Sequence, residues 1–533
     1  MGQSLLQPLQ KDHADFLRDE SRRAGTAESI SFPRTEREVR EVLSFCYREN
    51  IPVTVQGART GITAGATPAG GHILNLSRMD RISGLRRHPR EKEFYLRVQP
   101  GVTLTAIREA LAARKFNTED WDKASREALE KFLKATPRFF PPDPTETSAS
   151  IGGMAAANAS GACSFHYGPT RDYIQALRAV LADGSPVSLR RDIQHATGRS
   201  FALRSESGDV IEGTLPGYAL PAVKNAAGYH TAPHMPLLHF FIGSEGTLGV
   251  ITELELRLMA APGFRWALMA FFPEEAPAIR YVRAIRGEKV GGVSAAPALR
   301  PVAIEFFNHD ILELMRRQKA ANPAFTQVPD ILSSYHTAIY AEYHGEREDT
   351  LSDALMTAAE IVVICGGDVE ATWSATTPRE MERLVRFRHA APETVNLVID
   401  ERRRTEPALT KLGTDMAVPD AALEIVLHMY NEDLAESGLE SVIFGHVGNN
   451  HLHVNILPNN QQEYLRGRDL YLNWARQAVQ MGGTVSGEHG IGKLKTALLR
   501  EMYGEKGVEQ MRALKRLFDP KGILNRGNLF EMP

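Results

Sequence analysis

Cysteine is scarce in this chain, and the three cysteines stand far apart. Cys46, Cys163 and Cys365 match no zinc-binding or redox spacing, which favours buried thiols in a reducing compartment. Long apolar runs are also lacking, because none reaches the roughly 18 residues that a membrane-spanning helix needs. The N-terminus lacks the cationic and then apolar order of a signal peptide. We therefore expect a cytoplasmic protein, with peripheral attachment to the inner face of a membrane left open.

A large charge of either sign is missing as well. Lys and Arg number 62 and Asp and Glu 65, which leaves a formal net charge of −3. Proteins that bind nucleic acid usually carry a basic face. We therefore expect no nucleic-acid partner.

The length and the pattern of the chain indicate several domains of α+β type. A chain of 533 residues is too long for one ordinary core. Up to about residue 260 it reads mainly as strands and turns, and Pro262 and Gly263 mark a junction. Beyond it amphipathic helices alternate with strands, which suggests a sheet with one face covered by helices. We predict an N-terminal extension over residues 1–30, a first domain over 31–260 and a second over 261–533.

Single elements can be placed from their periodicity. Apolar residues at helical spacing predict helices over residues 36–47, 104–114 and 275–286, after an N-terminal helical stretch. Strands are predicted over residues 52–56, 73–76, 94–99 and 334–343. A further helix that begins near Thr118 and stops before Pro137 interrupts strand-rich sequence. We interpret residues 116–137 as a peripheral helical insertion.

Three histidines surround a Gly-Asn-Asn turn within residues 441–456. Two short apolar runs flank the turn, which predicts a β-hairpin because Asn tolerates the positive φ of tight turns. With Asn449 and Asn450 as the loop, His446 would pair with His453. Opposed Cβ atoms lie about 5 Å apart, so both rings could reach one divalent ion with bonds of about 2.1 Å. Alternatively, these imidazoles are half-buried strand residues with ordinary hydrogen bonds.

Other candidate groups extend this cluster. Strand alternation places His451 and Asn455 on the face of His453. In the glycine-rich segment 482–493, Glu488 could complete a His446/His453/Glu488 ligand set that leaves one position open, and His489 would lie beside it as a candidate base. The alternative is an ordinary loop with two polar residues.

Two cations precede the hairpin. Arg388 offers a planar fork that suits a carboxylate, and Lys411 offers a point charge. Either could equally be an ordinary surface cation.

Two stretches of small residues lie in the first half. Glycines within residues 57–66 allow backbone N–H groups to approach an anion closely, although a plain tight turn would look the same. Their spacing is neither GxGxxG nor GxxxxGKS/T, so neither a Rossmann site nor a P-loop is supported. Residues 151–161 permit close packing against a flat ligand or against backbone.

These two stretches, the Tyr-Gly and Arg-Asp pairs at 167–172 and the Gly-Ser-Glu-Gly-Thr-Leu-Gly segment at 243–249 resemble the FAD-binding domain of vanillyl-alcohol-oxidase-type flavoproteins. The resemblance implies two α+β subdomains that clamp an elongated FAD. It implies dissociable FAD, because the loop contains no histidine for a covalent link. The residues that it nominates for FAD contact are Gly57, Ala58, Arg59, Thr60, Gly61, Gly65, Ala66, Pro142, Gly152, Gly153, Asn158, Gly161, Tyr167, Gly168, Glu245, Ile251 and Asn525.

The second half is similar to the substrate domain of D-2-hydroxyacid dehydrogenases, a group that includes D-lactate, glycolate and D-2-hydroxyglutarate dehydrogenases. The similarity rests on Gly-His-x-Gly-x-x-x-Leu-His, Ser-x-Glu-His-Gly-Ile-Gly-Lys and the segment 518–525. It implies an antiparallel sheet and a divalent metal, zinc before manganese or iron. The implied metal ligands are His446, His453 and Glu488, with Asn455 nearby.

The same resemblance implies that His489 acts as the base and that Arg388 and Lys411 hold the substrate carboxylate. The chain departs from the family at its hairpin, which turns on Asn-Asn-His where relatives commonly have Asp-Gly-Asn. It also has Asn-Arg-Gly-Asn at 525–528, where Asn-Pro-Gly-Lys is common. His451 therefore either adds a metal ligand or changes the polarity near the substrate.

The resemblance implies FAD-dependent oxidation of a D-2-hydroxy acid to the 2-oxo acid, with hydride transfer to flavin N5 and assistance by the metal. The electron acceptor would be a quinone, an electron-transfer flavoprotein, a cytochrome or oxygen, and a homodimer is left open. One alternative is a flavoprotein of the same fold that acts on a lipid or a sugar, such as one resembling alkylglycerone-phosphate synthase. Others are a metallohydrolase and, least in keeping with the residues, an interaction module.

Overall fold

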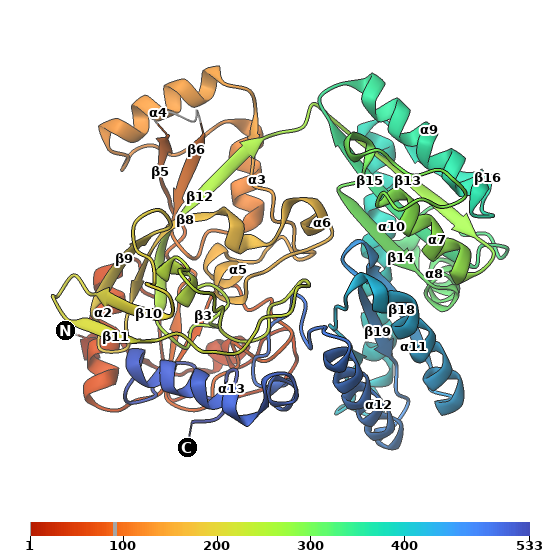
Figure 1. The fold of residues 1–533 in the computed structure, drawn as a ribbon. Helices are drawn as coiled ribbons and strands as arrows, with labels where there is room; N and C mark the ends of the chain where they lie inside the picture. The colour runs from red at the N-terminus through yellow and green to blue at the C-terminus, as the bar shows by residue number, and fades with distance from the viewer. Residues whose placement is uncertain (1, 89–92, 533) are drawn as a thin grey trace.

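The computed structural model describes residues 2–88 and 93–532 and arranges them in two bodies (Figure 1). The chain passes from the first body to the second between residues 260 and 264. The first body contains the elements up to strand β12 (Val250–Ala260) together with helix α13 (Thr496–Phe518). The second begins with strand β13 (Phe264–Phe272) and ends with helix α12 (Gln461–Gln480). The last part of the chain therefore returns to the body in which the chain began.

A small sheet of order β1-β2-β4-β3 lies near the N-terminus. Its strands β2, β4 and β3 run parallel, and helix α2 connects β2 to β3. The predicted apolar stripe of α2 is buried, and Thr35 caps the helix by accepting a hydrogen bond from the N–H of Glu38. The elements of this part are α1 (Gly2–Leu5), β1 (Gln7–Pro8), the 3-10 helix η1 (Lys11–Leu17), β2 (Ser29–Ser31), α2 (Glu36–Arg48), β3 (Val53–Gln56) and β4 (His72–Asn75).

The larger sheet of the first body has the order β5-β6-β12-β8-β9, with β7 paired to the end of β12. All of these pairs are antiparallel, and a separate hairpin joins β10 to β11. The elements are β5 (Ile82–Arg87), β6 (Phe94–Val98), α3 (Leu104–Ala113), α4 (Lys123–Lys134), β7 (Arg138–Phe139), α5 (Ile151–Ala157), α6 (Ser164–Tyr167), β8 (Ile174–Val180), β9 (Pro186–Arg190), β10 (Ser200–Arg204) and β11 (Val210–Thr214).

Two local predictions in this body need correction. The helix expected to begin near Thr118 begins only after Asp122, because the Asp122 carboxylate caps the N–H of Ser125. The small-residue stretch forms a helix, α5, that was not predicted. Gly152 lets this helix approach the turn that follows β6, since a Cβ there would lie 2.5 Å from the Cβ of Pro100.

The second body is built on a seven-stranded antiparallel sheet of order β16-β13-β15-β14-β18-β19-β17. Its strands are β14 (Ala303–Phe307), β15 (Thr337–Gly345), β16 (Asp368–Ala375), β17 (Leu412–Gly413), β18 (Ser441–His446) and β19 (His451–Ile456), besides β13. The helices between these strands in the chain are α7 (Glu275–Ile285), α8 (His309–Ala321), α9 (Glu348–Ile364), α10 (Pro378–Arg402) and α11 (Leu423–Ser437).

Helices cover both faces of this sheet, so the expectation of one covered face was wrong. Successive side chains of β13 point to opposite faces. Leu268, Ala270 and Phe272 pack in one core with α7 and α9, whereas Met269 and Phe271 pack in another with α8 and α10. Central strands with both faces buried are apolar throughout, which hides the alternation that a half-exposed sheet would display.

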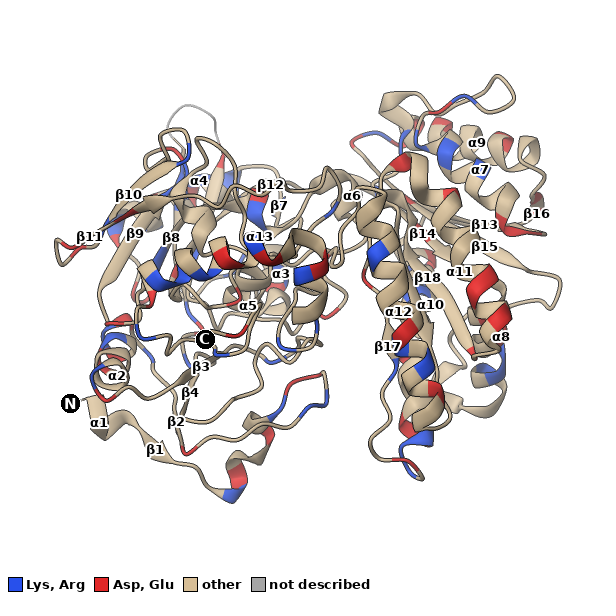
Figure 2. Cartoon of the chain, turned by 60° about the horizontal axis from the view of Figure 1, so that its bottom comes forward, with Lys and Arg blue, Asp and Glu red and all other residues tan. Residues whose placement is uncertain are grey.

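The C-terminal segment packs against the first body, near its N-terminal sheet. Helix α13 bends at Gly504, where φ is 66°, and lies along the bottom of the first body in Figure 1. Beyond it Leu524 forms a parallel bridge with Val53 of β3. In the part of the chain that the structure describes, no helix combines the length and the apolarity needed to cross a membrane. Basic and acidic residues are interspersed over the helices of both bodies (Figure 2).

Candidate active site

The histidine-bearing hairpin has a different register from the predicted one. A 3-10 turn, Val447–Asn449, followed by Asn450 at φ 52°, joins β18 to β19. His446 therefore pairs with His451, and Phe444 pairs with His453. The prediction failed because four residues, and not two, form the turn. A shift of two residues keeps every side chain on its face, so the three imidazoles still gather on one side.

Glu488 lies among these rings. Its Oε1 atom is 3.3 Å from Nε2 of His446 and 3.3 Å from Nε2 of His453. The other nitrogen of each ring is held by an oxygen. Nδ1–H of His446 donates to Glu305 on β14 at 2.7 Å, and Nδ1–H of His453 donates to the carbonyl of Thr414 at 2.9 Å. Both Nε2 atoms thereby point toward the same oxygen of Glu488, an arrangement that is typical of ligating histidines.

The donor set fits a divalent cation. Ligand atoms 3.3 Å apart match the edge of a tetrahedron with bonds of about 2.1 Å, which is about 3.4 Å. His446, His451, His453 and Glu488 each offer one ligand atom within 4.8 Å of the others. Two imidazoles and a carboxylate suit zinc, manganese or iron. Asn455 is more remote, because its amide donates to the carbonyl of His453 at 3.5 Å and its side chain faces Gly413.

A lysine that the sequence did not single out joins the cluster from the first body. Lys224 Nζ lies 2.6 Å from the second oxygen of Glu488, and both side chains are buried. Burial raises the pKa of Glu488, but Lys224 and His446 more than offset this and hold the pKa well below its usual value. Glu488 is therefore an anion that presents one free oxygen to the imidazoles. In the sequence, Lys224 begins the Lys-Asn-Ala-Ala-Gly-Tyr segment at 224–229, but nothing in that segment indicates that Lys224 contacts Glu488.

Asp415 is a second buried carboxylate that sequence reasoning missed. It accepts hydrogen bonds from Ser486 Oγ at 2.5 Å, Lys495 Nζ at 2.7 Å and His451 Nε2 at 2.9 Å. It also accepts the backbone N–H of His489 at 3.1 Å. This carboxylate holds the glycine-rich segment 484–492 in place against the hairpin.

His489 is the imidazole that a substrate could reach. Its Nδ1 lies 3.3 Å from Asp415 and its Nε2 lies 3.4 Å from Oε1 of Glu488. Its side chain is 27% exposed, whereas His446 and His453 are nearly closed off. Burial lowers the pKa of His489 below its usual value although Asp415 and Glu488 oppose this. The ring is therefore neutral near pH 7 and can accept a proton at Nε2.

Arg388 is a largely buried cation and not an ordinary surface cation. Its side chain on α10 is 15% exposed and lies 3.9 Å from Glu342. Burial lowers the pKa of Arg388, but Glu305, Tyr340 and Glu342 more than offset this, so the guanidinium stays charged. No residue of the described chain accepts a hydrogen bond from it, which leaves its donors free for an anion. The negative groups around it hold the charge in place without occupying the donors.

Lys411 is bonded to helix α10 and not to the histidines. Its Nζ donates to the amide oxygen of Asn396 on α10 at 3.0 Å. Burial, and then the charge of Arg22, lower the pKa of Lys411 to about 8. The structure brings Lys411 to the same helix as Arg388 but not into contact with the histidine cluster.

The glycine-rich loop at 57–66 fits a phosphate-bearing ligand. Among the described residues, none accepts a hydrogen bond from the backbone N–H groups of residues 59–65. Arg59 and Ala64 have positive φ angles of 62° and 60°, and no atom lies within 4 Å of a Cβ placed on Gly61. Consecutive free N–H groups in such a conformation form an anion-binding concavity. This donor set fits the pyrophosphate of FAD.

Hydrogen bonds connect this loop to helix α5, and α5 to the segment that contains Glu245. Ala58 N–H donates to Ser150 at the start of α5, and the N–H groups of Gly243 and Glu245 donate to the carbonyls at its end. The side chains of three nominated residues are hydrogen-bonded to other parts of the protein. Glu245 accepts the N–H groups of Ile491 and Gly492, Asn525 bonds Val55 and Glu245, and Tyr167 bonds His344 of the second body.

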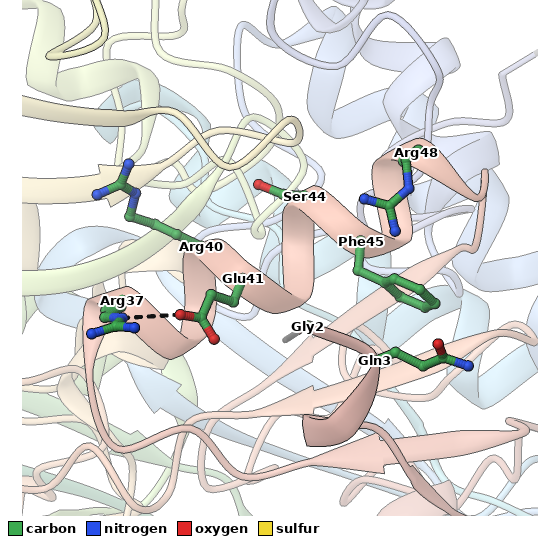
Figure 3. Close-up of a pocket in the computed structure, with 8 residues that line it drawn as sticks. All are labelled: Gly2, Gln3, Arg37, Arg40, Glu41, Ser44, Phe45 and Arg48. Carbon is green, nitrogen blue, oxygen red and sulfur yellow. Dashed lines mark hydrogen bonds and ion pairs between the residues drawn. The ribbon is translucent and has the colours of Figure 1, made fainter.

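The remaining nominated residues do not all face open space. A Cβ on Gly161 would lie 2.0 Å from the carbonyl of Asp143, and one on Gly57 would lie 2.1 Å from Ser150 Oγ. These glycines are therefore required by backbone packing whatever else they contact. A separate surface cavity lies between α1 and α2, where three arginines line it with Glu41 and Ser44 (Figure 3). None of the candidate site residues lines that cavity.

The comparisons with known proteins agree with this geometry. The family described as "FAD binding domain" matches residues 27–123 and 124–190, and "FAD linked oxidases, C-terminal domain" matches residues 264–529. The chain belongs to the FAD-linked oxidases. The predicted family resemblance is thereby confirmed.

Relatives of this FAD-linked oxidase cover nearly the whole chain. A probable mitochondrial D-lactate dehydrogenase of Danio rerio is 29% identical, over 97% of this chain and 87% of the relative. A D-lactate dehydrogenase of Archaeoglobus fulgidus is 29% identical, over 93% and 90%. The glycolate oxidase subunit GlcD of Bacillus subtilis is 27% identical, over 94% and 89%. The protein is an FAD-dependent oxidoreductase of the D-lactate, glycolate and D-2-hydroxyglutarate dehydrogenase type.

Solved structures agree on the fold alone. p-Cresol methylhydroxylase with substrate bound superposes with a TM-score of 0.66 at 15% identity, covering 100% of this chain and 95% of that one. An alkyldihydroxyacetonephosphate synthase gives 0.61 at 14% identity, covering 98% and 82%. The predicted α+β class, with a flavin domain followed by a domain built on an antiparallel sheet, is confirmed.

Proposed function

We propose that this FAD-linked oxidase oxidises a D-2-hydroxy acid to the 2-oxo acid at the junction of its two bodies. The observation that carries the proposal is that the site contains both a neutral, reachable base and a charged guanidinium that donates no hydrogen bond to any described residue. His489 and Arg388 supply these two groups. His489 contacts Glu488, and the charge of Arg388 acts on Glu305, the carboxylate that holds His446. A hydroxyl next to a carboxylate is the substrate chemistry that this combination suits.

Each group has a separate task. Arg388 would hold the substrate carboxylate through two parallel N–H···O bonds, and Lys411 would add a second positive charge. This orients the C–H bond at the α-carbon, which is the positional part of catalysis. His489 Nε2 would accept the hydroxyl proton, and Asp415 would steady the resulting imidazolium. When bound, FAD supplies a hydride acceptor at N5 and a divalent metal lowers the pKa of the substrate hydroxyl.

The metal would be held by His446, His453 and Glu488, and zinc is our first choice among zinc, manganese and iron. FAD would be dissociable, since residues 57–66 contain no histidine. Electrons would leave to a separate acceptor. One relative, from Arabidopsis thaliana and 26% identical, carries "cytochrome" in its name, which supports a cytochrome alongside a quinone, an electron-transfer flavoprotein or oxygen.

The proposal is tested by anaerobic reduction of the bound flavin. Purified holoenzyme is mixed with D-lactate, glycolate, D-2-hydroxyglutarate and the L enantiomers, and the flavin absorbance is followed. We expect at least one D-2-hydroxy acid or glycolate to bleach the flavin, and we expect L-lactate not to do so. If none of the hydroxy acids bleaches it, the substrate class is wrong.

The same experiment is repeated after metal removal with a chelator and after addition of zinc, manganese or iron. We expect bleaching to be lost on chelation and restored by one of the ions. Full activity in protein that metal analysis shows to be empty would contradict the role of the metal while leaving the substrate class intact. Acid precipitation of the holoenzyme tests the flavin linkage, because dissociable FAD stays in the supernatant.

A further inference from the structure

His451 is the one member of the histidine cluster whose second ring nitrogen has no partner among the described residues. The residue is fully buried, at 0% exposure. Its Nε2–H donates to Asp415 at 2.9 Å, but its Nδ1 contacts no donor or acceptor within hydrogen-bonding distance. Buried polar atoms are almost always paired, so an unpaired one needs a physical explanation.

The neighbours of His451 show which ligand would occupy that nitrogen. Its ring centroid lies 4.4 Å from that of His453 and 5.6 Å from that of His446. The ligand atoms of these three rings and of Glu488 lie within 4.8 Å of one another. A cation bound among these four groups is the partner that their chemistry suits.

Asp415 determines which nitrogen carries the proton. This carboxylate receives the Nε2–H of His451 and also the ammonium of Lys495 at 2.7 Å. A carboxylate accepts and cannot donate, so Nε2 keeps the hydrogen and Nδ1 keeps its lone pair. A carboxylate behind a ligating imidazole is the usual way in which a protein selects the metal-binding nitrogen.

Gly487 admits the ring to this position. A Cβ there would lie 2.9 Å from Cε1, 3.0 Å from Nε2 and 3.1 Å from Nδ1 of His451. The glycine backbone thus lies flat against the edge of the imidazole and prevents it from turning away. Glu488 follows directly in the chain, so the packing of this ring and the placement of the carboxylate ligand depend on the same turn.

We infer that His451 is a fourth protein ligand of the metal, which gives a set of three imidazoles and one carboxylate. The inference rests on the proposed function, since it concerns the same metal site. Asp415 would then orient two groups, His451 as a ligand and His489 as the base. A zinc ion held by these four residues would still offer a fifth position to a substrate oxygen, since zinc sites can become five-coordinate.

Zinc K-edge X-ray absorption on wild-type holoenzyme loaded with one equivalent of zinc tests the inference directly. The multiple-scattering pattern of imidazole counts the histidine ligands. We expect three. A count of two would overturn the inference and leave the proposed function standing. A wild-type protein that takes up no zinc would overturn the inference and the choice of zinc, whereas flavin bleaching decides the substrate class separately.

Variants provide an independent measurement of zinc affinity by competition with a chelator. For His451→Asn we expect zinc to bind at least about 10-fold more weakly and the imidazole count to fall to two. His428→Asn is the control, because His428 is an exposed histidine on α11 paired with Glu432. It should keep wild-type affinity and count. Equal affinity in wild type and His451→Asn would overturn the inference.

A second variant keeps His451 but displaces its ring through a substitution at a neighbouring residue. Gly487→Ala adds a methyl group against the ring, and we expect a lower zinc affinity with the flavin still bound. Should His451→Asn fail to fold, as judged by absent flavin absorbance, the wild-type ligand count and Gly487→Ala still decide the question. Unchanged affinity in Gly487→Ala together with a count of two would end the proposal.

Discussion

Lys224 and Glu488 form a buried ion pair of 2.6 Å between the two bodies of the molecule, 264 residues apart in the chain. The pair occupies one oxygen of Glu488 and leaves the other facing His446 and His453. It therefore connects a residue of the first body to the candidate metal site.

Replacing Lys224 by Met should destabilise the metal-free protein more than the metal-loaded protein. Breaking a buried pair leaves an uncompensated charge and costs about 3 kcal/mol or more, whereas a bound cation would neutralise Glu488. Thermal unfolding with chelator and with zinc measures the difference. Lys506→Met, at an exposed lysine, is the control and should change neither transition. Equal loss under both conditions would separate Lys224 from the metal site.

His489→Ala should abolish flavin reduction by the hydroxy acid while leaving FAD bound. Removal of a general base typically lowers the rate by about 10²- to 10⁴-fold, and His489 lies outside the loop at 57–66 that fits FAD. Anaerobic stopped-flow absorbance measures the reduction, and the flavin-to-protein absorbance ratio measures FAD content. His428→Ala is the matched control. Reduction at the wild-type rate would show that another group takes the proton.

Arg388→Lys should weaken substrate binding by about 10- to 100-fold, with a smaller effect on kcat. Lysine keeps the positive charge between Glu305 and Glu342 but loses the planar fork that binds a carboxylate through two hydrogen bonds. Those bonds to a charged group are worth about 1.5–3 kcal/mol. Arg386→Lys is the control, because Arg386 lies on the same helix and pairs with Glu382 at the surface. A KM unchanged from wild type would assign the carboxylate to another cation.

Substrate affinity should fall as the pH rises through about 8. Lys411 has its pKa lowered to about 8, so it is charged below that pH and neutral above it, whereas the substrate carboxylate stays ionised. We expect KM to rise about 10-fold between pH 7 and pH 9, as one titrating group requires. Lys411→Arg stays charged and should have a flat KM profile over this range. The two pH profiles are compared at saturating acceptor. Parallel profiles in the two proteins would exclude Lys411 from substrate binding.

Several elements could be predicted because their signals are local. Helix α2 follows from Val39, Val42, Leu43 and Cys46 at helical spacing, and its apolar face is buried as expected. Helix α5 was missed because its residues are glycine and alanine, which carry little periodicity, and its cap at Ser150 was not recognised. The boundaries of α4 moved by a few residues because Asp122 supplies a better cap than Thr118.

The hairpin shows which features local sequence patterns predict and which they do not. Alternation along the strand correctly put His446, His451 and His453 on one face, since the period of a strand is two residues. The register was wrong, because whether a turn uses two residues or four depends on how Val447 packs in the core and on the αL conformation of Asn450. The helices on the second face of the sheet were missed for a similar reason, because a fully buried strand shows no alternation.

The sequence by itself determined the family and nominated the residues of the flavin loop and of the candidate site, since these depend on residue types at short spacings. Only the tertiary structure decided the partners of those residues. Lys224 reaches Glu488 from the other body, Glu305 orients His446 from a neighbouring strand, and Asp415 holds both His451 and His489. These contacts join residues that are distant in the chain, and burial makes each of them strong. No local pattern encodes which distant charge a folded chain will place beside a carboxylate.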